Sequence, residues 1–341
     1  MTDGRLEGSR HSAAIGGHEA KLVRTDFATT GYAASRLGFG GMELSGPPRS
    51  VEISEGQSIR VLHAAFDFGI NYFDTSIDYG LSEERIGVAF KGRRENIILA
   101  TKCGCDVSNG SGEHAPHVYT PENIRKGVAQ SLKRLRTDYI DVMQLHGNPT
   151  VEQLESQGGL DALIELRDKG VIRQIGLSTR KPYLKEFVDL DILNVFQLPY
   201  SAIQRQHEDI AEALSAKGKA IVARGVTARG SVAKGWTVTP VGMKEGQAQS
   251  IWEVAKLDEL LDGMSRIEFM IRFALTSPAL SLCLVGTTNV SHLEANILAS
   301  ERGPLDADLY HQALKRLTEA GSAPGDAEYA RGGPKPPQRP R

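Results

Sequence analysis

The chain has 341 residues, of which 40% are hydrophobic and 24% are charged, and its formal net charge is -2. This composition is typical of an ordinary globular protein. It lacks the excess of basic residues that binding to a nucleic-acid backbone requires, so nucleic acid is not an expected partner. The length allows two average domains, but a single α/β barrel of more than about 200 residues is common.

The first 20 residues and the cysteines indicate which cellular compartment to expect for this protein. Residues 1–20 contain no apolar run like the core of a secretory signal, and no segment approaches the roughly 20 apolar residues of a membrane span. Three cysteines, an odd number, do not suggest a disulfide framework, so we expect a cytoplasmic protein without a membrane partner. We expect flexible segments at 1–20 and 321–341 around one domain at 21–320.

Short β-type runs recur along the chain with helix-like segments between them. Several runs are almost entirely apolar, as at residues 97–100, which is typical of parallel strands buried on both faces. The pattern predicts strands at 36–41, 71–75, 96–102, 139–146, 172–178, 195–199, 219–224 and 281–286.

Helix signals separate these runs. Thr120 and Pro121 open an amphipathic segment that ends at Leu135, and another helical segment stops before Gly170. The alternation predicts βαβ units, and eight of them match a closed (β/α)₈ TIM barrel. An open doubly wound sheet is a poorer match, because no Gly-x-Gly-x-x-Gly follows the first strand.

In such a barrel the chemistry lies at the carboxyl ends of the strands. Three predicted strands end near Asp74, on Lys102 and on His146, and Tyr79 follows Asp74 after a short loop. Taken singly, each residue has an ordinary explanation as a packed aromatic, a solvated lysine, a turn cap or a core histidine. Because the strand ends converge, the four residues together favour catalysis.

The four side chains suit proton transfer to a carbonyl oxygen. A phenol has a pKa near about 10, and a lysine ammonium beside it lowers that pKa. We therefore expect Tyr79 to act as general acid, Lys102 to lower its pKa, and Asp74 to keep Lys102 charged and oriented. His146 would donate or position a hydrogen bond to the substrate oxygen as a hydride reaches the carbonyl carbon.

These residues lie in a longer motif. Residues 69–80 read Gly-x-Asn-x-Phe-Asp-Thr-x-x-x-Tyr-Gly and are followed by Ser82 and Glu83, while Ala-Thr-Lys ends at Lys102. With His146 closing the fourth strand, the sequence resembles the aldo-keto reductase family over about residues 20 to 320. The resemblance implies an NADPH-dependent carbonyl reductase, with NAD as a possible cofactor, whose catalytic residues are Asp74, Tyr79, Lys102 and His146.

The resemblance also implies the cofactor contacts. Ser178 and Gln197 match family residues that hold the nicotinamide carboxamide, but Thr179 stands where the family has Asn. Arg224 replaces an aromatic ring that many members stack on the nicotinamide, and a planar guanidinium can also stack. The implied cofactor-binding residues are Gly41, Met42, Asp74, Ser178, Thr179, Gln197, Arg224, Gly225, Val226, Thr227, Arg229, Gly286, Thr287, Thr288, Asn289, His292 and Asn296.

The segment from Gly286 to Asn289 lies at a predicted helix start, and a helix amino terminus is a ready anion site for the adenosine 2'-phosphate. Family members often place Lys or Arg there, whereas this loop offers hydroxyls, Asn289, backbone amides and His292. Thr287 and Asn289 could instead only cap the helix, which is compatible with either cofactor. We expect NADP rather than NAD.

Parts of the sequence allow three other interpretations. Cys103, Cys105, His114 and His117 could suggest zinc, but Cys-x-Cys spacing is tighter than in usual zinc sites, so no metal is expected. A sugar-phosphate isomerase would use the strand-eight phosphate site without a nucleotide, but it leaves Tyr79 beside Lys102 unexplained. A cofactor-binding regulatory protein with little turnover is the third. The expected substrate is a small carbonyl or alcohol, sugar-derived or from secondary metabolism.

Overall fold

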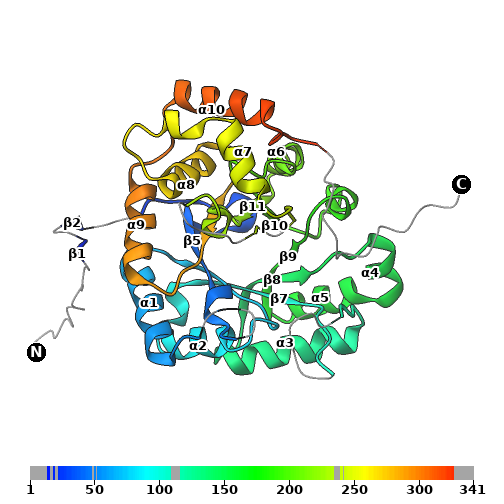
Figure 1. Ribbon diagram of the computed structural model, residues 1–341. Helices are drawn as coiled ribbons and strands as arrows, with labels where there is room; N and C mark the ends of the chain where they lie inside the picture. Colours follow the sequence, from blue (N-terminus) through cyan, green and yellow to red (C-terminus); the bar gives the residue numbers. More distant parts are fainter. Residues whose placement is uncertain are drawn as a thin grey trace, which may run out of the picture.

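The computed structural model describes residues 22–47, 50, 52–108, 116–233, 239–240 and 242–325, and the backbone of 14–15 and 18–19. Within these residues eight parallel strands close into a barrel, and helices surround it (Figure 1). The predicted (β/α)₈ barrel is therefore confirmed. No helix in the described ranges is both long and apolar enough to cross a bilayer.

The eight barrel strands follow one another around the barrel in chain order. The last strand pairs with the first, Cys283 lying opposite Leu37, and this pairing closes the sheet. Each observed strand falls within two residues of its predicted limits. The strands are β5 (Leu37–Gly40), β6 (Tyr72–Asp74), β7 (Ile98–Cys103), β8 (Ile140–His146), β9 (Ile172–Ser178), β10 (Val195–Pro199), β11 (Ala220–Arg224) and β12 (Leu282–Val285).

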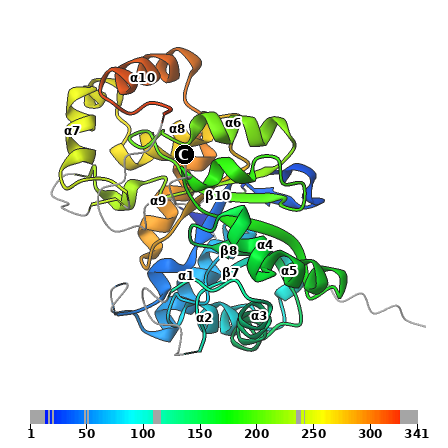
Figure 2. The same ribbon diagram turned by 90° about the vertical axis from the view of Figure 1, so that its right-hand side faces the viewer.

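Helices α1–α5 cover one side of the barrel and α6–α10 the other, as the two views show (Figures 1 and 2). Local signals set their limits: the Thr120 hydroxyl accepts a hydrogen bond from the Asn123 amide at the start of α3, as predicted. The helices are α1 (Glu55–Asp67), α2 (Ser82–Ala89), α3 (Pro121–Leu135), α4 (Val151–Gln157), α5 (Gly159–Asp168), α6 (Glu208–Ala216), α7 (Gln247–Val254), α8 (Arg266–Thr276), α9 (Val290–Glu301) and α10 (Ala307–Glu319).

The amino end of the barrel carries a hairpin of β3 (Arg24–Asp26) and β4 (Ala33–Ser35). Asn71 holds it there, because its side-chain oxygen accepts from the Ser35 amide and its nitrogen donates to the Ala33 carbonyl. Inside the barrel, buried side chains such as Tyr72, Val142 and Val222 form an apolar layer. The hairpin and this layer close the centre of the barrel at its amino end.

The ends of the chain are described only in part. Residues 14–15 and 18–19 form β1 (Ala14–Ile15) and β2 (His18–Glu19), an antiparallel pair. At the other end Ser322 donates to the Ala202 carbonyl, and Lys181 donates to the Gly325 carbonyl. The packed body therefore reaches 325, and the rest of the two segments that we expected to be flexible lies outside the described residues.

Helices α2 and α3 touch through Gly87. A Cβ at this position would stand 2.4 Å from the Arg134 carbonyl oxygen, whereas a Cβ at Gly127 on α3 would meet only side chains, at 3.6 and 3.8 Å. We therefore expect Gly87→Ala to lower the free energy of unfolding by about 1–3 kcal/mol through overpacking. Gly127→Ala, the matched control, should raise it by up to about 1 kcal/mol because alanine favours helix. Urea unfolding of both variants checks this, and equal stability would contradict the close packing.

Candidate active site

The loop from Asp74 to Ser82 is fixed by its own hydrogen bonds. The Thr75 hydroxyl donates to the Ser82 hydroxyl over 2.8 Å, and Ser82 donates to the Gly41 carbonyl over 2.8 Å. Gly80 has φ of +44°, and a Cβ there would stand 2.5 Å from the Ser45 carbonyl oxygen. A glycine is therefore required directly after Tyr79, and the loop holds Tyr79 at the carboxyl end of the barrel.

A buried ion pair lies at the centre of this end. Lys102 Nζ donates to Asp74 Oδ2 over 2.7 Å and to the Thr75 carbonyl over 2.7 Å. The other carboxylate oxygen, Oδ1, accepts from Gln144 Nε2 at 2.9 Å and from Gln197 Nε2 at 2.8 Å. Asp74 and Lys102 are almost fully buried, with 3% and 1% of their surface exposed. The charges are therefore held by one another and by amide donors from two further strands.

Tyr79 lies against this pair. Lys102 Nζ is 4.9 Å from the centre of the Tyr79 ring. Burial raises the pKa of Tyr79; Lys102 opposes this rise, while Asp74 and Asp78 add to it. The sequence led us to expect a lowered pKa, and the difference arises because burial disfavours the phenolate more than the ammonium favours it. The Tyr79 side chain is therefore a protonated phenol at neutral pH.

Lys102 itself stays charged. Desolvation acts to lower the pKa of its ammonium, but Asp74, Tyr79 and Asp78 together outweigh that effect and leave the pKa raised. A charged ammonium beside a phenol stabilises the phenolate that remains after proton donation.

His146 completes the group at the end of β8. Its ring centre is 6.4 Å from that of Tyr79, and the two rings meet edge to face. Burial lowers the pKa of His146 to about 3; Asp78 opposes this shift, while Lys102 and His117 add to it. The imidazole is therefore neutral at ordinary pH, and one ring nitrogen can donate while the other accepts. The structure thus brings all four predicted catalytic residues to one place.

The residues expected to hold the nicotinamide carboxamide are also linked to this group. Ser178 donates to Gln197 Oε1 over 2.9 Å, and Gln197 Nε2 in turn donates to Asp74. Thr179, which replaces the family's Asn, donates to Asn148 Oδ1 over 3.2 Å. Asn148 therefore places a side-chain amide beside Thr179, the position at which the resemblance implied an asparagine.

Two residues of this network were missed from the sequence. Gln144 was part of a predicted strand, and a lone Gln among apolar neighbours in a buried strand was a signal that could have marked it. Asn148 lies in the short loop after β8, and its approach to Thr179 depends on the conformation of that loop.

The remaining predicted cofactor residues lie at neighbouring strand ends. Gly41 and Met42 begin a 3-10 turn (Gly41–Leu44) after β5. Arg224 ends β11, and Gly225, Val226, Thr227 and Arg229 follow it. Gly286, Thr287 and Thr288 lie between β12 and α9, with Asn289 as the helix cap, while on α9 His292 is exposed and Asn296 is buried.

The start of α9 shows the capping that the sequence allowed. Asn289 Oδ1 accepts from the Ser291 amide over 2.8 Å, and Thr287 accepts from the Asn289 amide over 3.1 Å. Both side chains therefore serve the helix, and the exposed backbone around Gly286 is left at the positive end of the helix dipole.

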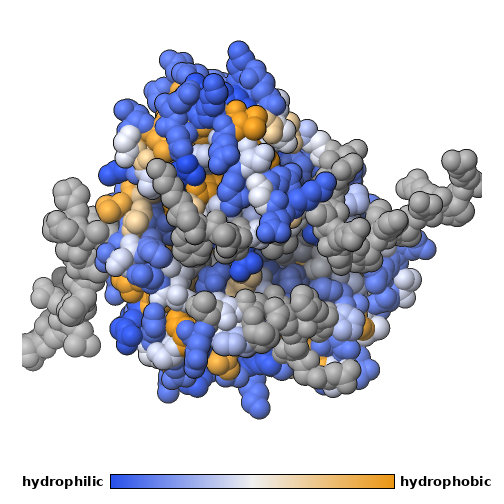
Figure 3. Space-filling model, viewed as in Figure 1, coloured by the Kyte–Doolittle hydropathy of each residue, from blue (hydrophilic) through white to orange (hydrophobic). Residues whose placement is uncertain are grey.

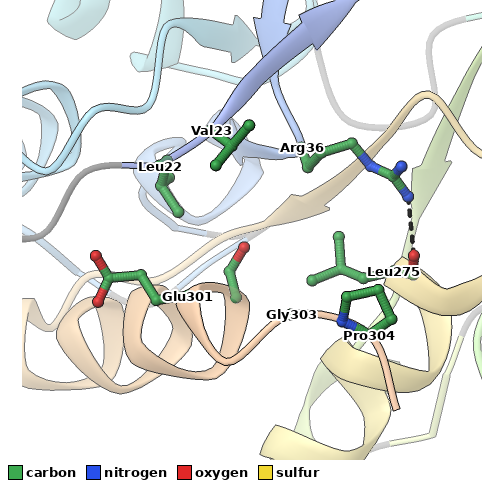
Figure 4. Close-up of a pocket in the computed structure, with 8 residues that line it drawn as sticks. Leu22, Val23, Arg36, Leu275, Glu301, Gly303 and Pro304 are labelled. Carbon is green, nitrogen blue, oxygen red and sulfur yellow. Dashed lines mark hydrogen bonds between the residues drawn. The ribbon is translucent and has the colours of Figure 1, made fainter. Parts of the chain in front are cut away.

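A separate cavity of about 400 Å³ lies at the other end of the barrel (Figure 4). Leu22, Val23 and Arg36 line it, and Arg36 donates to the Leu275 carbonyl over 2.9 Å. Arg36 precedes β5, so this cavity faces away from the strand ends that carry Tyr79 and His146. It is not part of the candidate active site.

The outer surface offers few apolar side chains. The face in Figure 3 is mainly hydrophilic, with hydrophobic residues in small separate groups. In the described part of the chain the exposed large hydrophobic side chains are Val23, Leu81, Val254 and Leu298. These are scattered single residues, as on most protein surfaces.

Comparison with known proteins gives consistent matches. Residues 36–316 match the model of the Aldo/keto reductase family. The chain is 30% identical over 291 residues to the uncharacterized oxidoreductase YqkF of Bacillus subtilis, covering 82% of this chain and 91% of that protein. It is 31% identical over 294 residues to the aldo-keto reductase YhdN of the same organism, covering 80% and 86%.

A solved structure agrees with these matches. The holo form of aldo-keto reductase AKR11C1 from Bacillus halodurans superposes with a TM-score of 0.77 at 28% identity. The superposition covers 89% of this chain and 98% of that one.

The neutral state of His146 predicts how stability depends on pH. The folded protein keeps His146 neutral down to about pH 3, whereas a histidine in the unfolded chain takes up a proton near about pH 6.5. The unfolded state therefore binds more protons in this window, and the free energy of unfolding falls as pH falls from about 6.5 towards 3.

We expect His146→Gln to flatten this dependence by up to about 1.4 kcal/mol per pH unit. Urea unfolding between pH 6.5 and pH 4.5 measures it. His311→Gln, on the exposed face of α10, is the control and should leave the slope unchanged. An identical slope in wild type and His146→Gln would contradict the neutral imidazole.

Proposed function

This chain belongs to the aldo/keto reductase family, whose members are NAD(P)H-dependent oxidoreductases acting on carbonyl groups, and we propose that it reduces an aldehyde or ketone with NADPH. The observation that carries the proposal is the buried Lys102–Asp74 pair directly beneath the Tyr79 ring. A surface lysine would be solvated, and a purely structural tyrosine would not need a buried ammonium 4.9 Å from its ring.

The protonation states support reduction. Tyr79 carries its proton at neutral pH because burial raises its pKa, so it can donate that proton to the substrate oxygen. Lys102 remains charged and stabilises the phenolate left behind. Proton uptake from solvent then restores the phenol, and the reverse sequence of transfers would serve alcohol oxidation.

His146 has a different role in this proposal. As a neutral imidazole it donates a hydrogen bond to the substrate oxygen and orients the carbonyl towards Tyr79, without adding a second positive charge beside Lys102. When bound, a reduced nicotinamide supplies the hydride that the carbonyl carbon accepts as its C=O π bond becomes a C–O single bond.

The residues present fit a nicotinamide nucleotide. Gln197 uses one of its two N–H groups on Asp74 and one lone pair of its oxygen on Ser178, so one donor and one acceptor remain for a carboxamide. Asn148, held by Thr179, adds an amide at the same place. Arg224 is half-buried at the end of β11, where its guanidinium can stack on a ring or pair with a phosphate.

The choice of NADP over NAD rests on the start of α9. A helix amino terminus attracts a phosphate through its backbone amides and dipole, and Thr287, Asn289 and the exposed His292 add hydrogen-bonding groups. Because no lysine or arginine lies between 286 and 292, the preference should be moderate.

The proposed substrate class and cellular compartment rest on general features of the site and of the cysteines. Asp78, His117 and His146 surround the position in front of Tyr79 with polar groups, which suits a small polar carbonyl such as a sugar-derived or secondary-metabolite compound. Cys103, Cys105 and Cys283 are not joined in disulfides, which suits a reducing compartment such as the cytoplasm.

Tyr79→Phe tests the general acid. It should lower kcat by about 100-fold or more and leave NADPH affinity within about twofold, because the phenol acts on the substrate oxygen and not on the cofactor. Absorbance of NADPH with a reactive aldehyde measures turnover, and fluorescence quenching measures binding. Tyr139→Phe, at the opposite end of β8, is the matched control and should keep wild-type activity. Turnover retained in Tyr79→Phe would remove Tyr79 from the mechanism.

The same assays with NADH test the cofactor. We expect kcat/KM with NADPH to exceed that with NADH by about tenfold, which corresponds to about 1.4 kcal/mol from hydroxyl, amide and imidazole contacts. A preference for NADH would contradict the assignment of the α9 start to a 2'-phosphate. Absence of binding by either nucleotide would overturn the reductase proposal and favour a nucleotide-independent enzyme.

A further inference from the structure

Three potential metal ligands meet beside the catalytic residues. They are Cys105 and His117, from the loop after β7, and His146 at the end of β8. One donor atom from each lies within 4.8 Å of the others, and Cys105 Sγ is 3.4 Å from His146 Nδ1. The set differs from the one weighed in the sequence, where Cys103 and His114 were included and His146 was not.

Cys103 does not belong to this group, for a physical reason. Cys103 packs into the main hydrophobic core, and burial raises the pKa of its thiol to about 12, so it stays protonated and faces apolar neighbours. His114 lies outside the described residues. Cys105 instead belongs to a small cluster with Ile77 and Val107 near the mouth of the barrel, where His146 can reach it.

The backbone holds Cys105 and His117 side by side. They form an antiparallel bridge, which the Asp106 amide closes by donating to the Pro116 carbonyl over 2.8 Å. Asn123 on α3 fastens this bridge, because its Nδ2 donates to the Cys105 carbonyl at 3.0 Å and to the Val118 carbonyl at 2.7 Å. The two side chains are therefore held together by the fold and do not meet by chance.

The His117 ring packs closely against the backbone at the end of β8. Gly147, directly after His146, has φ of +96°, and a Cβ there would stand 2.8 Å from His117 Nε2. The absence of a side chain at Gly147 allows the His117 ring to approach that of His146, with the ring centres 5.4 Å apart at 81°. The glycine thus brings the second imidazole to the first.

The chemistry of the three groups matches a borderline-soft cation. Thiolate and imidazole are the usual ligands of Zn²⁺, at about 2.3 Å and 2.0–2.1 Å, so tetrahedral geometry separates sulfur and nitrogen by about 3.6 Å. The observed 3.4 Å between Cys105 and His146 is close to that value.

We propose that Cys105, His117 and His146 bind one Zn²⁺ ion at the mouth of the barrel. The Asp78 carboxylate, 3.6 Å from His146 Nδ1, or a water molecule takes the fourth position. On binding, the zinc ion exchanges coordinated water for the Cys105 sulfur and two imidazole nitrogens, and the Cys105 thiol releases its proton to solvent. If the proposed reductase function holds, the ion also occupies the polar position in front of Tyr79 that Asp78, His117 and His146 surround, so zinc inhibits turnover and a chelator restores it.

The test is a binding measurement that does not depend on activity. Full-length protein is treated with a chelator, dialysed, and titrated with ZnCl₂ by calorimetry, and in parallel with Co²⁺ followed by absorbance. We expect one equivalent of each metal to bind, and a sulfur-to-cobalt charge-transfer band to appear. Cys105→Ser should remove that band, and Cys105→Ser and His117→Gln should each weaken zinc binding by about tenfold or more.

The controls are matched by residue type. Cys283→Ser changes a buried thiol on β12, and His311→Gln changes an exposed histidine on α10; both should keep wild-type zinc affinity. Circular dichroism establishes that each variant is folded. If Cys105→Ser does not fold, the cobalt spectrum of the wild-type protein decides alone, because the charge-transfer band requires a thiolate ligand.

The proposal is overturned if the wild-type protein binds no stoichiometric zinc, if cobalt gives no charge-transfer band, or if the Cys105 and His117 variants bind zinc as tightly as the controls. Zinc binding with no effect on turnover would keep the site and reject only the inhibition. Failure of NADPH binding would reject the reductase function and leave the metal titrations unaffected, so the two proposals can fail separately.

Discussion

The buried ion pair between Lys102 and Asp74 is the constraint on which the active end of the barrel depends. Removing two charges from water is costly, and the cost is offset only where both ions have complete hydrogen bonding. Asp74 receives donors from Lys102, Gln144 and Gln197, on three strands other than its own, and Lys102 also donates to the Thr75 carbonyl. The pair therefore ties β6, β7, β8 and β10 together at their carboxyl ends.

The same pair links stability with chemistry. Buried ion pairs can often be replaced by apolar side chains without loss of stability, so stability alone does not account for this pair. What apolar residues cannot supply is a fixed positive charge under the Tyr79 ring. Because burial raises the pKa of that phenol, the ammonium does not make Tyr79 a phenolate in the resting protein. In the proposed reaction its effect is on the state after proton donation, where the negative charge on Tyr79 is new.

The sequence predicted those features that depend on local patterns. Apolar runs in the sequence predicted all eight strands. The last residues of those strands pointed to Asp74, Lys102 and His146, because the direction of a strand fixes which end of the barrel its last residue reaches. Contacts made by loops were missed: Asn148 meets Thr179, and His117 meets His146 only because of the bridge to Cys105. The direction of the Tyr79 pKa shift was also missed, since it depends on burial, which the sequence pattern does not measure.

Desolvation at the barrel mouth has two consequences for the same imidazole. Enclosure near Lys102 keeps His146 neutral, so in the proposed reaction His146 donates a hydrogen bond without adding a second positive charge beside the ammonium. A neutral ring is also what a metal ion requires. A charged histidine would resist zinc but would compete with Lys102 for the carboxylates nearby. The environment proposed to favour proton transfer therefore also suits a thiophilic cation, for which Cys105 and His117 offer the remaining donor atoms.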